Sequence, residues 1–437
     1  MSKKVVTLPD IPGTGDELED YVAALFQASG HFVEKHIVER DPADLLELDI
    51  FATNYATDPV VRRLIEVKGG KWGYTDLFKV VGWMRYLELD HGAFFVTKWD
   101  DRESAPDRMG PLGLDVICFD DFATAPKIFE DSGFGAPDPD LLDLWRHSCE
   151  VERRLVKLIL AKAKGGSEGA KETKVYYDLI NNGTFLARAP EESLALLYGA
   201  YMSHPKLTLG YALELDGGTF DPHSPPTKSA SCEAAMQSGK HPDLQACMYL
   251  EHRARLAILK AAVDYAIANP DGPPSLISED GKFFFRGLSY HSLPASFQNG
   301  MDWLREQPNF KLYATFWQQF LWGWGGFYLE DRTEKEFEWM STHSGIPADE
   351  IPTALEAFDR FFPLPDGWFV TAGATDVHMV KMVPLVFQGV GAHRRREEYD
   401  LSSGLDGLNA TSRFTPDDLA KRINCAVEFL LADLKAL

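Results

Sequence analysis

Asp49 and the triplet Glu66-Val67-Lys68 are the residues of this chain whose types and spacing best suit chemistry. They fall in segments 46–51 and 63–68, which their apolar content predicts to be β-strands. Lys68 follows Glu66 by two residues, so both side chains point to the same face of a strand. Carboxylates are natural ligands of the hard cation Mg²⁺. Two acids and a lysine together therefore predict a phosphodiester-hydrolysing centre, where the metal holds water and phosphate and the lysine orients the water.

The elements that must position these residues follow one another in a regular order. Leu18, Val22, Leu25 and Phe26 recur at helical spacing and predict a helix over 16–26. We expect strands at 31–36, 46–51 and 63–68, then a helix over 76–89, then strands at 93–97 and 116–119. The predicted order is therefore αβββαβ within residues 14–122.

This order and the two motifs resemble the PD-(D/E)xK nuclease superfamily, and its Mrr-like and Holliday-resolvase-like members in particular. The resemblance covers residues 14–122, and the Pro of the superfamily's name is missing before the second acid. It implies an α/β, restriction-endonuclease-like core with Mg²⁺ or Mn²⁺ as cofactor. Asp49, Glu66 and Lys68 would be catalytic, and the metal ligands would be Glu19, Asp49, Glu66 and Val67. Glu17 and Asp20 lie within one helical turn of Glu19 and stay open as alternatives to it.

Basic residues near the motifs are candidates for binding nucleic acid. Lys71 follows the flexible pair Gly69-Gly70, and Arg62 and Lys79 lie in or near the two elements around the motif. The formal net charge of −22 argues against a protein that coats nucleic acid with its whole surface. We therefore expect local contacts to a nucleic acid substrate, most simply DNA, through Lys71, Arg62 and Lys79.

The rest of the chain has a different periodicity. We assign 1–130 to the nuclease-like domain, 131–140 to a Pro/Gly-rich linker and 141–437 to a mainly α-helical domain. Its helices are expected at 141–164, 190–202 and 244–269, with short strands at 282–285 and 368–371. A subdivision at the Gly-, Pro- and Ser-rich segment 214–242 stays open. The expected role of this domain is sensing, recruitment of a protein partner or homo-oligomerisation.

Residues 316–328 combine aromatic side chains with glycines. Such a segment could stack bases or close a ligand pocket. Large aromatic side chains are more often buried, so an aromatic core is the favoured interpretation.

Cysteine usage and hydropathy indicate the compartment. The five cysteines form no Cys-x-x-Cys pair, which favours a reducing environment. No N-terminal signal-peptide core and no apolar run of bilayer-spanning length is present. We therefore expect a cytoplasmic protein that does not bind membranes.

Together these features predict a Mg²⁺-dependent nuclease that hydrolyses phosphodiester bonds, most simply in DNA. The resemblance also suggests an effector of a restriction or anti-phage system. The alternative is a catalytically inactive nuclease fold that acts as a scaffold or interaction subunit. Asp49, Glu66 and Lys68 are all retained, which favours the enzyme.

Overall fold

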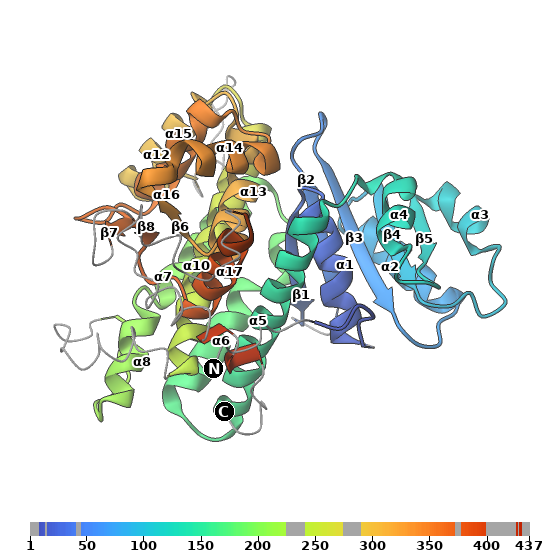
Figure 1. Cartoon of the computed structure of the whole chain (residues 1–437), viewed down its shortest axis with the longest axis horizontal. Coiled ribbons are helices and arrows are strands. Elements are labelled where there is room, and N and C mark those ends of the chain that lie inside the picture. The colour runs from blue at the N-terminus through green and yellow to red at the C-terminus, as the bar shows by residue number, and fades with distance from the viewer. Residues whose placement is uncertain are drawn as a thin grey trace, which may run out of the picture. The chain divides into compact units, whose positions relative to one another are not determined.

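The chain divides into two compact units in the computed structural model (Figure 1). The structure describes residues 8–13, 15–40, 45–223, 241–273, 290–371, 377–398, 425–426 and 428–430. One unit, here called the N-terminal unit, comprises Thr7–Glu150 and Asn181–Arg188. The other, the helical unit, comprises Met1–Val6, Val151–Ile180 and Ala189–Leu437. The division thus falls after Glu150, rather than within the expected linker at 131–140.

A five-stranded mixed sheet forms the centre of the N-terminal unit. Its strands lie in chain order: β1 (Phe32–Glu39), β2 (Leu46–Asn54), β3 (Val61–Lys68), β4 (His91–Val96) and β5 (Leu114–Cys118). The first three strands pair antiparallel, and β3, β4 and β5 pair parallel. Helix α1 (Asp16–Ala28) precedes the sheet, and α2 (Tyr74–Tyr86) makes the crossover from β3 to β4. The predicted mixed α/β class and the order αβββαβ are confirmed at this level.

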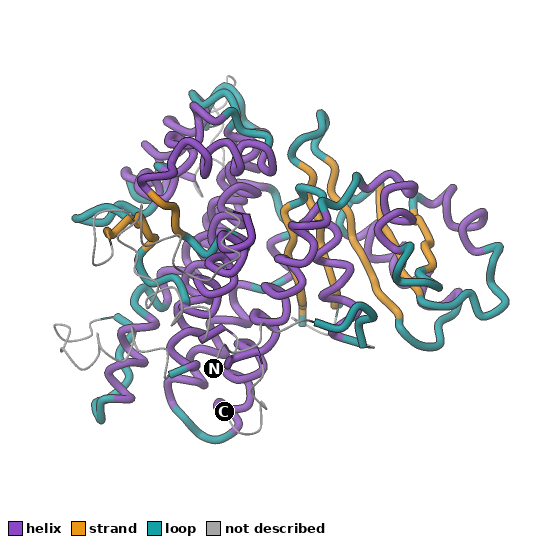
Figure 2. The backbone as a smooth tube through the Cα atoms, viewed as in Figure 1, coloured by secondary structure: helices purple, strands orange, loops and turns teal. Residues whose placement is uncertain are grey.

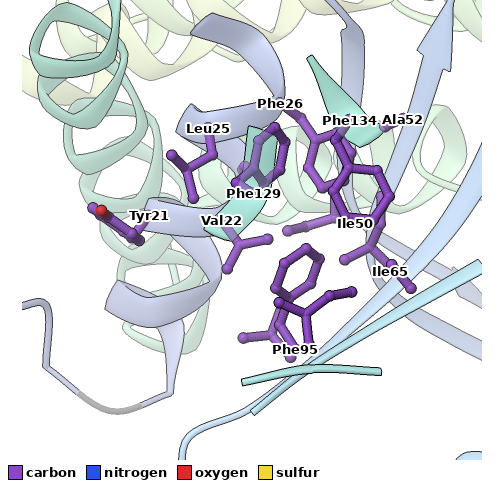
Figure 3. Close-up of a cluster of buried hydrophobic side chains, with 14 of the residues drawn as sticks. Tyr21, Val22, Leu25, Phe26, Ile50, Ala52, Ile65, Phe95, Phe129 and Phe134 are labelled. Carbon is purple, nitrogen blue, oxygen red and sulfur yellow. The ribbon is translucent and has the colours of Figure 1, made fainter. Parts of the chain in front are cut away.

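Two hydrophobic cores hold the sheet between its helices. In the α1-side core, Phe26 of α1 packs against Ile50, Ile65 and Phe95 of the sheet (Figure 3). In the α2-side core, Leu77 and other residues of α2 pack against strand residues that include Leu64, Phe94 and Val96. Because both faces are covered, the central strands are apolar on both sides, as is usual for parallel strands.

The segment expected to be a linker is part of the fold. Short helices α3 (Ala105–Met109) and α4 (Ala125–Phe129) lead to a helical turn at Glu130–Phe134. Phe134 is 3% exposed and belongs to the α1-side core. Helix α5 (Pro139–Lys164) then begins within the expected linker.

A later part of the chain returns to the edge of the sheet. The Val38 N–H donates to the carbonyl of Asn181 at 3.1 Å, and Val38 forms a bridge with Asn182. The Thr184 hydroxyl donates to Glu39 at 3.0 Å. Part of the outer edge of β1 is therefore paired, which limits association with other strands.

The helical unit is mainly α-helical, as expected, and Figure 2 shows helices as its main element. Its described helices beyond α5 are α6 (Glu168–Ile180), α7 (Pro190–Ser203), α8 (Leu207–Leu215), α10 (Pro242–Ala268), α12 (Ala295–Arg305), α13 (Tyr313–Gln318), α14 (Thr333–Ser344), α15 (Ile351–Leu355), α16 (Ala357–Phe361) and α17 (Leu385–Glu398). A small sheet has the order β6 (Phe327–Leu329), β8 (Val377–Val380), β7 (Phe369–Thr371). The strand expected at 368–371 corresponds to β7, whereas 282–285 and most of 214–242 lie outside the described residues.

The aromatic segment 316–328 is buried except at Tyr328, which is half-buried. Phe316, Trp317, Phe320 and Trp324 are all 0% exposed, and the rings of Trp317 and Phe358 stack at 3.9 Å between centroids. The segment forms a core, and its favoured interpretation is confirmed. Among the described residues, none of the helices is long and apolar enough to cross a membrane.

The α1-side core yields a stability prediction. Phe26 is fully buried, and its ring contacts the rings of Phe95, Phe129 and Phe134. We expect Phe26→Ala to destabilise the N-terminal unit by about 3–5 kcal/mol. Amide hydrogens of β3 and β4 should then exchange about a hundredfold faster or more.

Phe78→Ala is the matched control, since Phe78 is 57% exposed on α2. Phe78→Ala should have little effect on amide hydrogen exchange in β3 and β4, because surface substitutions usually change stability little. Equal exchange in the two variants would contradict the assignment of Phe26 to the core.

Candidate active site

The pairing of β2 with β3 brings Asp49 beside Glu66. The strands pair Phe51 with Leu64 and Ile50 with Ile65, so the next step along this register reaches Asp49 and Glu66. The Val67 N–H donates to Asp49 Oδ2 at 2.9 Å. This hydrogen bond ties the Asp49 side chain to β3, next to Glu66.

Strand β2 changes its side-chain alternation at Asp49. Residues two apart on a regular strand face the same side of the sheet. Leu48 lies in the α2-side core, however, and Ile50 lies in the α1-side core. The alternation of side chains between the two faces of the sheet is therefore interrupted at Asp49. This is the residue whose carboxylate accepts the hydrogen bond from the Val67 N–H.

In strand β1 the alternation of side chains between the two faces of the sheet is also interrupted, at the position opposite Asp49. Val33 lies in the α1-side core and Ile37 in the α2-side core, although they are four residues apart. Between them His36 has φ +55°, a left-handed conformation that is uncommon for residues other than glycine. The pairs on either side of His36 place it opposite Asp49.

Glu66 is the most buried of the predicted site residues, at 2% exposed. Its Oε1 lies 2.5 Å from Lys68 Nζ and 3.8 Å from Lys79 Nζ. Lys79 reaches it from α2, with its ammonium 4.1 Å from the centre of the Trp83 ring. Oε2 of Glu66 is buried and has no hydrogen-bond partner among the described residues.

The acids of α1 have separate partners, which distinguishes among the alternatives left open by the sequence. Asp20 binds Lys35 at 2.9 Å, and both side chains are buried. Glu17 accepts a hydrogen bond from the Gly13 N–H at 2.8 Å. Glu19 is the acid whose charge interacts with Glu66 and Lys68, and its Oε2 lies 3.8 Å from His36 Nδ1.

Burial and mutual repulsion perturb the acids of the site. The pKa of Asp49 is raised from 3.8 to about 8, mainly by burial and to a lesser extent by repulsion from Glu66 and Glu19. The pKa of Glu19 is raised from 4.5 to about 7, again mainly by burial and to a lesser extent by repulsion from Asp16 and Asp20. Burial lowers the pKa of Lys68, but its contact with Glu66 outweighs this and leaves it raised.

These residues have the donor chemistry of a hard-cation site. Carboxylates of Asp49, Glu66 and Glu19 come from three elements, and the buried Oε2 of Glu66 lacks a hydrogen-bond partner among the described residues, a place that a cation could take. Val67 has an apolar, buried side chain, so it can contribute only its main chain. Within the described ranges, no group of three or more His, Cys, Asp or Glu side chains is already gathered to hold a metal.

The predicted nucleic-acid contacts are only partly brought together. Lys71 is exposed just after β3, close in sequence to the site. Arg62 lies at the beginning of β3, six residues before Lys68, or roughly 20 Å away along the strand. Lys79 lies at the site itself, beside Glu66.

Sequence reasoning missed His36 and the contact of Lys79 with Glu66. A left-handed residue inside a strand leaves no sequence signal when it is not a glycine. The position of Lys79 on the helix after the Glu66 strand was visible, but its reach to Glu66 depends on packing. In comparisons with known proteins, no family model, curated protein or solved structure matches the chain.

The raised pKa of Asp49 predicts a pH-dependent stability. Between pH 4 and 8 the folded protein holds a proton on Asp49 that the unfolded chain releases, so stability falls as pH rises through this window. Asn keeps the acceptor for the Val67 N–H and cannot ionise. The melting temperature of Asp49→Asn minus that of the wild type should therefore increase from pH 5 to pH 9 with chelator present.

Glu47→Gln, at an exposed position of the same strand, is the matched control. The difference between its melting temperature and that of the wild type should stay nearly constant from pH 5 to pH 9. A constant difference for Asp49→Asn as well would show that this carboxyl is not buried beside other acids.

Proposed function

We propose that this protein is a metal-dependent nuclease with a restriction-endonuclease-like N-terminal core. The observation that carries the proposal is the buried Glu66 carboxylate, with one oxygen bound to Lys68 and the other without a partner among described residues. Asp49 lies beside it on the next strand, and Glu19 adds a third charge from α1. An acidic, partly desolvated centre with a lysine is suited to phosphodiester hydrolysis.

Each residue has a role that follows from its position. Glu19, Asp49, Glu66 and the main chain of Val67 would hold Mg²⁺ or Mn²⁺. When bound, the metal supplies a Lewis acid and a more acidic water. Lys68, held against Glu66, orients water and stabilises negative charge that develops on phosphate. Lys79 adds a second positive charge at Glu66, which offsets repulsion between the acids and the substrate.

The perturbed acids couple metal binding to protons. Asp49 and Glu19 are partly protonated near neutral pH because of burial and repulsion. A carboxyl must lose its proton to bind a cation, so affinity should increase with pH.

The proposed substrate is DNA, approached through exposed Lys71 beyond the end of β3. The net charge of −22 would keep non-specific affinity low. A cytoplasmic location is proposed from the cysteine usage, and a role in restriction or anti-phage defence from the resemblance. The helical unit would provide the surface for a protein partner or a second copy.

A scaffold without catalysis is the second candidate. The observation in its favour is that Lys68 already neutralises Glu66 at 2.5 Å, while no three-ligand set is gathered among the described residues. Metal binding distinguishes the two candidates, because a scaffold does not need it.

The first test is stabilisation by metal. Mn²⁺ or Mg²⁺ at a hundredfold excess over its dissociation constant should raise the melting temperature of the wild type by about 5–10 °C. Glu66→Gln and Asp49→Asn should lose most of this increase, and Glu47→Gln should retain it. A wild type that does not respond to millimolar Mg²⁺ or Mn²⁺ would count against the nuclease.

The second test is cleavage of plasmid DNA with Mg²⁺ or Mn²⁺. Asp49→Asn, Glu66→Gln and Lys68→Ala should each lower the rate by about a hundredfold or more. Lys68→Ala should still be stabilised by metal, because it is not a ligand. Lys127→Ala, at an exposed lysine on α4, is the control. Full activity in all three site variants would place cleavage elsewhere.

A third test separates binding from cleavage. Lys71→Ala should weaken DNA binding and reduce the slope of log affinity against log salt by about one. It should leave metal stabilisation unchanged. An unchanged slope would show that Lys71 does not contact phosphate.

A further inference from the structure

His36 is the residue of the candidate site that the function proposed above does not use. We propose that its imidazole is an additional ligand of the metal centre and that it selects Mn²⁺ or Co²⁺ over Mg²⁺ and Ca²⁺. This inference rests on the proposed function, since it requires a divalent cation beside Asp49 and Glu66.

The backbone of β1 places His36 opposite Asp49. His36 lies within β1 with φ +55°, and left-handed residues other than glycine are strained unless their surroundings hold them. The strand alternation changes at this residue, as it does at Asp49 on β2. The pairs Lys35 with Ile50 and Ile37 with Leu48 leave His36 directly opposite Asp49.

His36 and Glu19 lie near each other without a direct hydrogen bond. Nδ1 of His36 lies 3.8 Å from Oε2 of Glu19, which is too far for a hydrogen bond. Two ligand atoms at about 2.1 Å from an octahedral ion are separated by about 3.0 Å when adjacent and about 4.2 Å when opposite. The observed 3.8 Å equals neither value, so a bound ion would have to draw the two atoms about 0.8 Å closer to make them adjacent ligands.

The surroundings of His36 allow a cation to enter. The side chain of His36 is 35% exposed and that of Glu19 is 18% exposed, so both meet solvent. Asp49 interacts electrostatically with Glu66 and Glu19, so His36 borders a connected group of acids from α1, β2 and β3. Oε2 of Glu66 is a buried oxygen of this group of acids that has no hydrogen-bond partner among the described residues.

The ligand chemistry then determines the metal. Carboxylate oxygens suit Mg²⁺, Ca²⁺ and Mn²⁺, whereas an imidazole nitrogen favours later transition metals. A centre of carboxylates with one imidazole should therefore bind Mn²⁺ and Co²⁺ more tightly than carboxylates alone, with little gain for Mg²⁺.

Two substitutions remove the imidazole and keep the backbone. Asn and Gly both tolerate the left-handed conformation, so His36→Asn and His36→Gly should preserve the bend of β1. His91→Asn is the matched control, because His91 is an exposed histidine at the start of β4. Circular dichroism and melting temperature without metal verify that each variant folds.

The experiment measures binding of Mn²⁺, Co²⁺ and Mg²⁺ to the full chain by calorimetry. His36→Asn and His36→Gly should bind Mn²⁺ and Co²⁺ about tenfold or more weakly, and Mg²⁺ with nearly unchanged affinity. The visible absorption bands of bound Co²⁺ should also shift when the nitrogen ligand is lost. His91→Asn should match the wild type in each measurement.

The contradicting outcomes separate this inference from the proposed function. If the wild type binds the metals and both His36 variants bind Mn²⁺ and Co²⁺ equally well, His36 is not a ligand, but the nuclease proposal stands. If the affinity for Mg²⁺ falls as much as the affinity for Mn²⁺, His36 affects the site as a whole. The proposed selectivity for Mn²⁺ and Co²⁺ is then wrong. If the wild type binds no divalent cation, both proposals fail.

Discussion

Burial of the Glu66 charge is the constraint on which the rest of the site depends. A carboxylate that is 2% exposed is unfavourable unless cations and hydrogen-bond donors replace its water. Lys68 comes from the same strand and Lys79 from α2, so the β3–α2 connection must place both ammonium groups at one oxygen. The two hydrophobic cores fix that connection from both sides of the sheet.

The strand register is the second requirement, because it decides which acids meet. Shifting β2 by one residue against β3 would replace Asp49 by an apolar neighbour and expose core residues. The hydrogen bond from the Val67 N–H to Asp49 fixes this register at the site itself. The break in alternation at Asp49 and at His36 then places polar side chains where a regular sheet would continue its apolar pattern.

Much of the N-terminal unit could be predicted from periodicity, and the reasons for the exceptions are physical. Strong apolar alternation marked the strands and helices, and the spacing of Asp49 and Glu66 placed them on neighbouring strands. Packing alone distinguished Glu19 from Asp20, which binds Lys35. Composition was misleading at 131–140, where Phe134 enters a core despite polar and glycine neighbours. The conformation of His36 depends on long-range pairing, which a local pattern does not encode.

The return of Asn181–Arg188 to the edge of β1 has a consequence for biosynthesis. The N-terminal unit is discontinuous in sequence, since Val151–Ile180 belongs to the helical unit. A nascent chain therefore cannot complete this unit until Arg188 has left the ribosome, although its sheet residues have emerged long before. Until then the outer edge of β1 lacks its Asn181 and Asn182 contacts, so its backbone groups stay open to pairing with another strand during this interval.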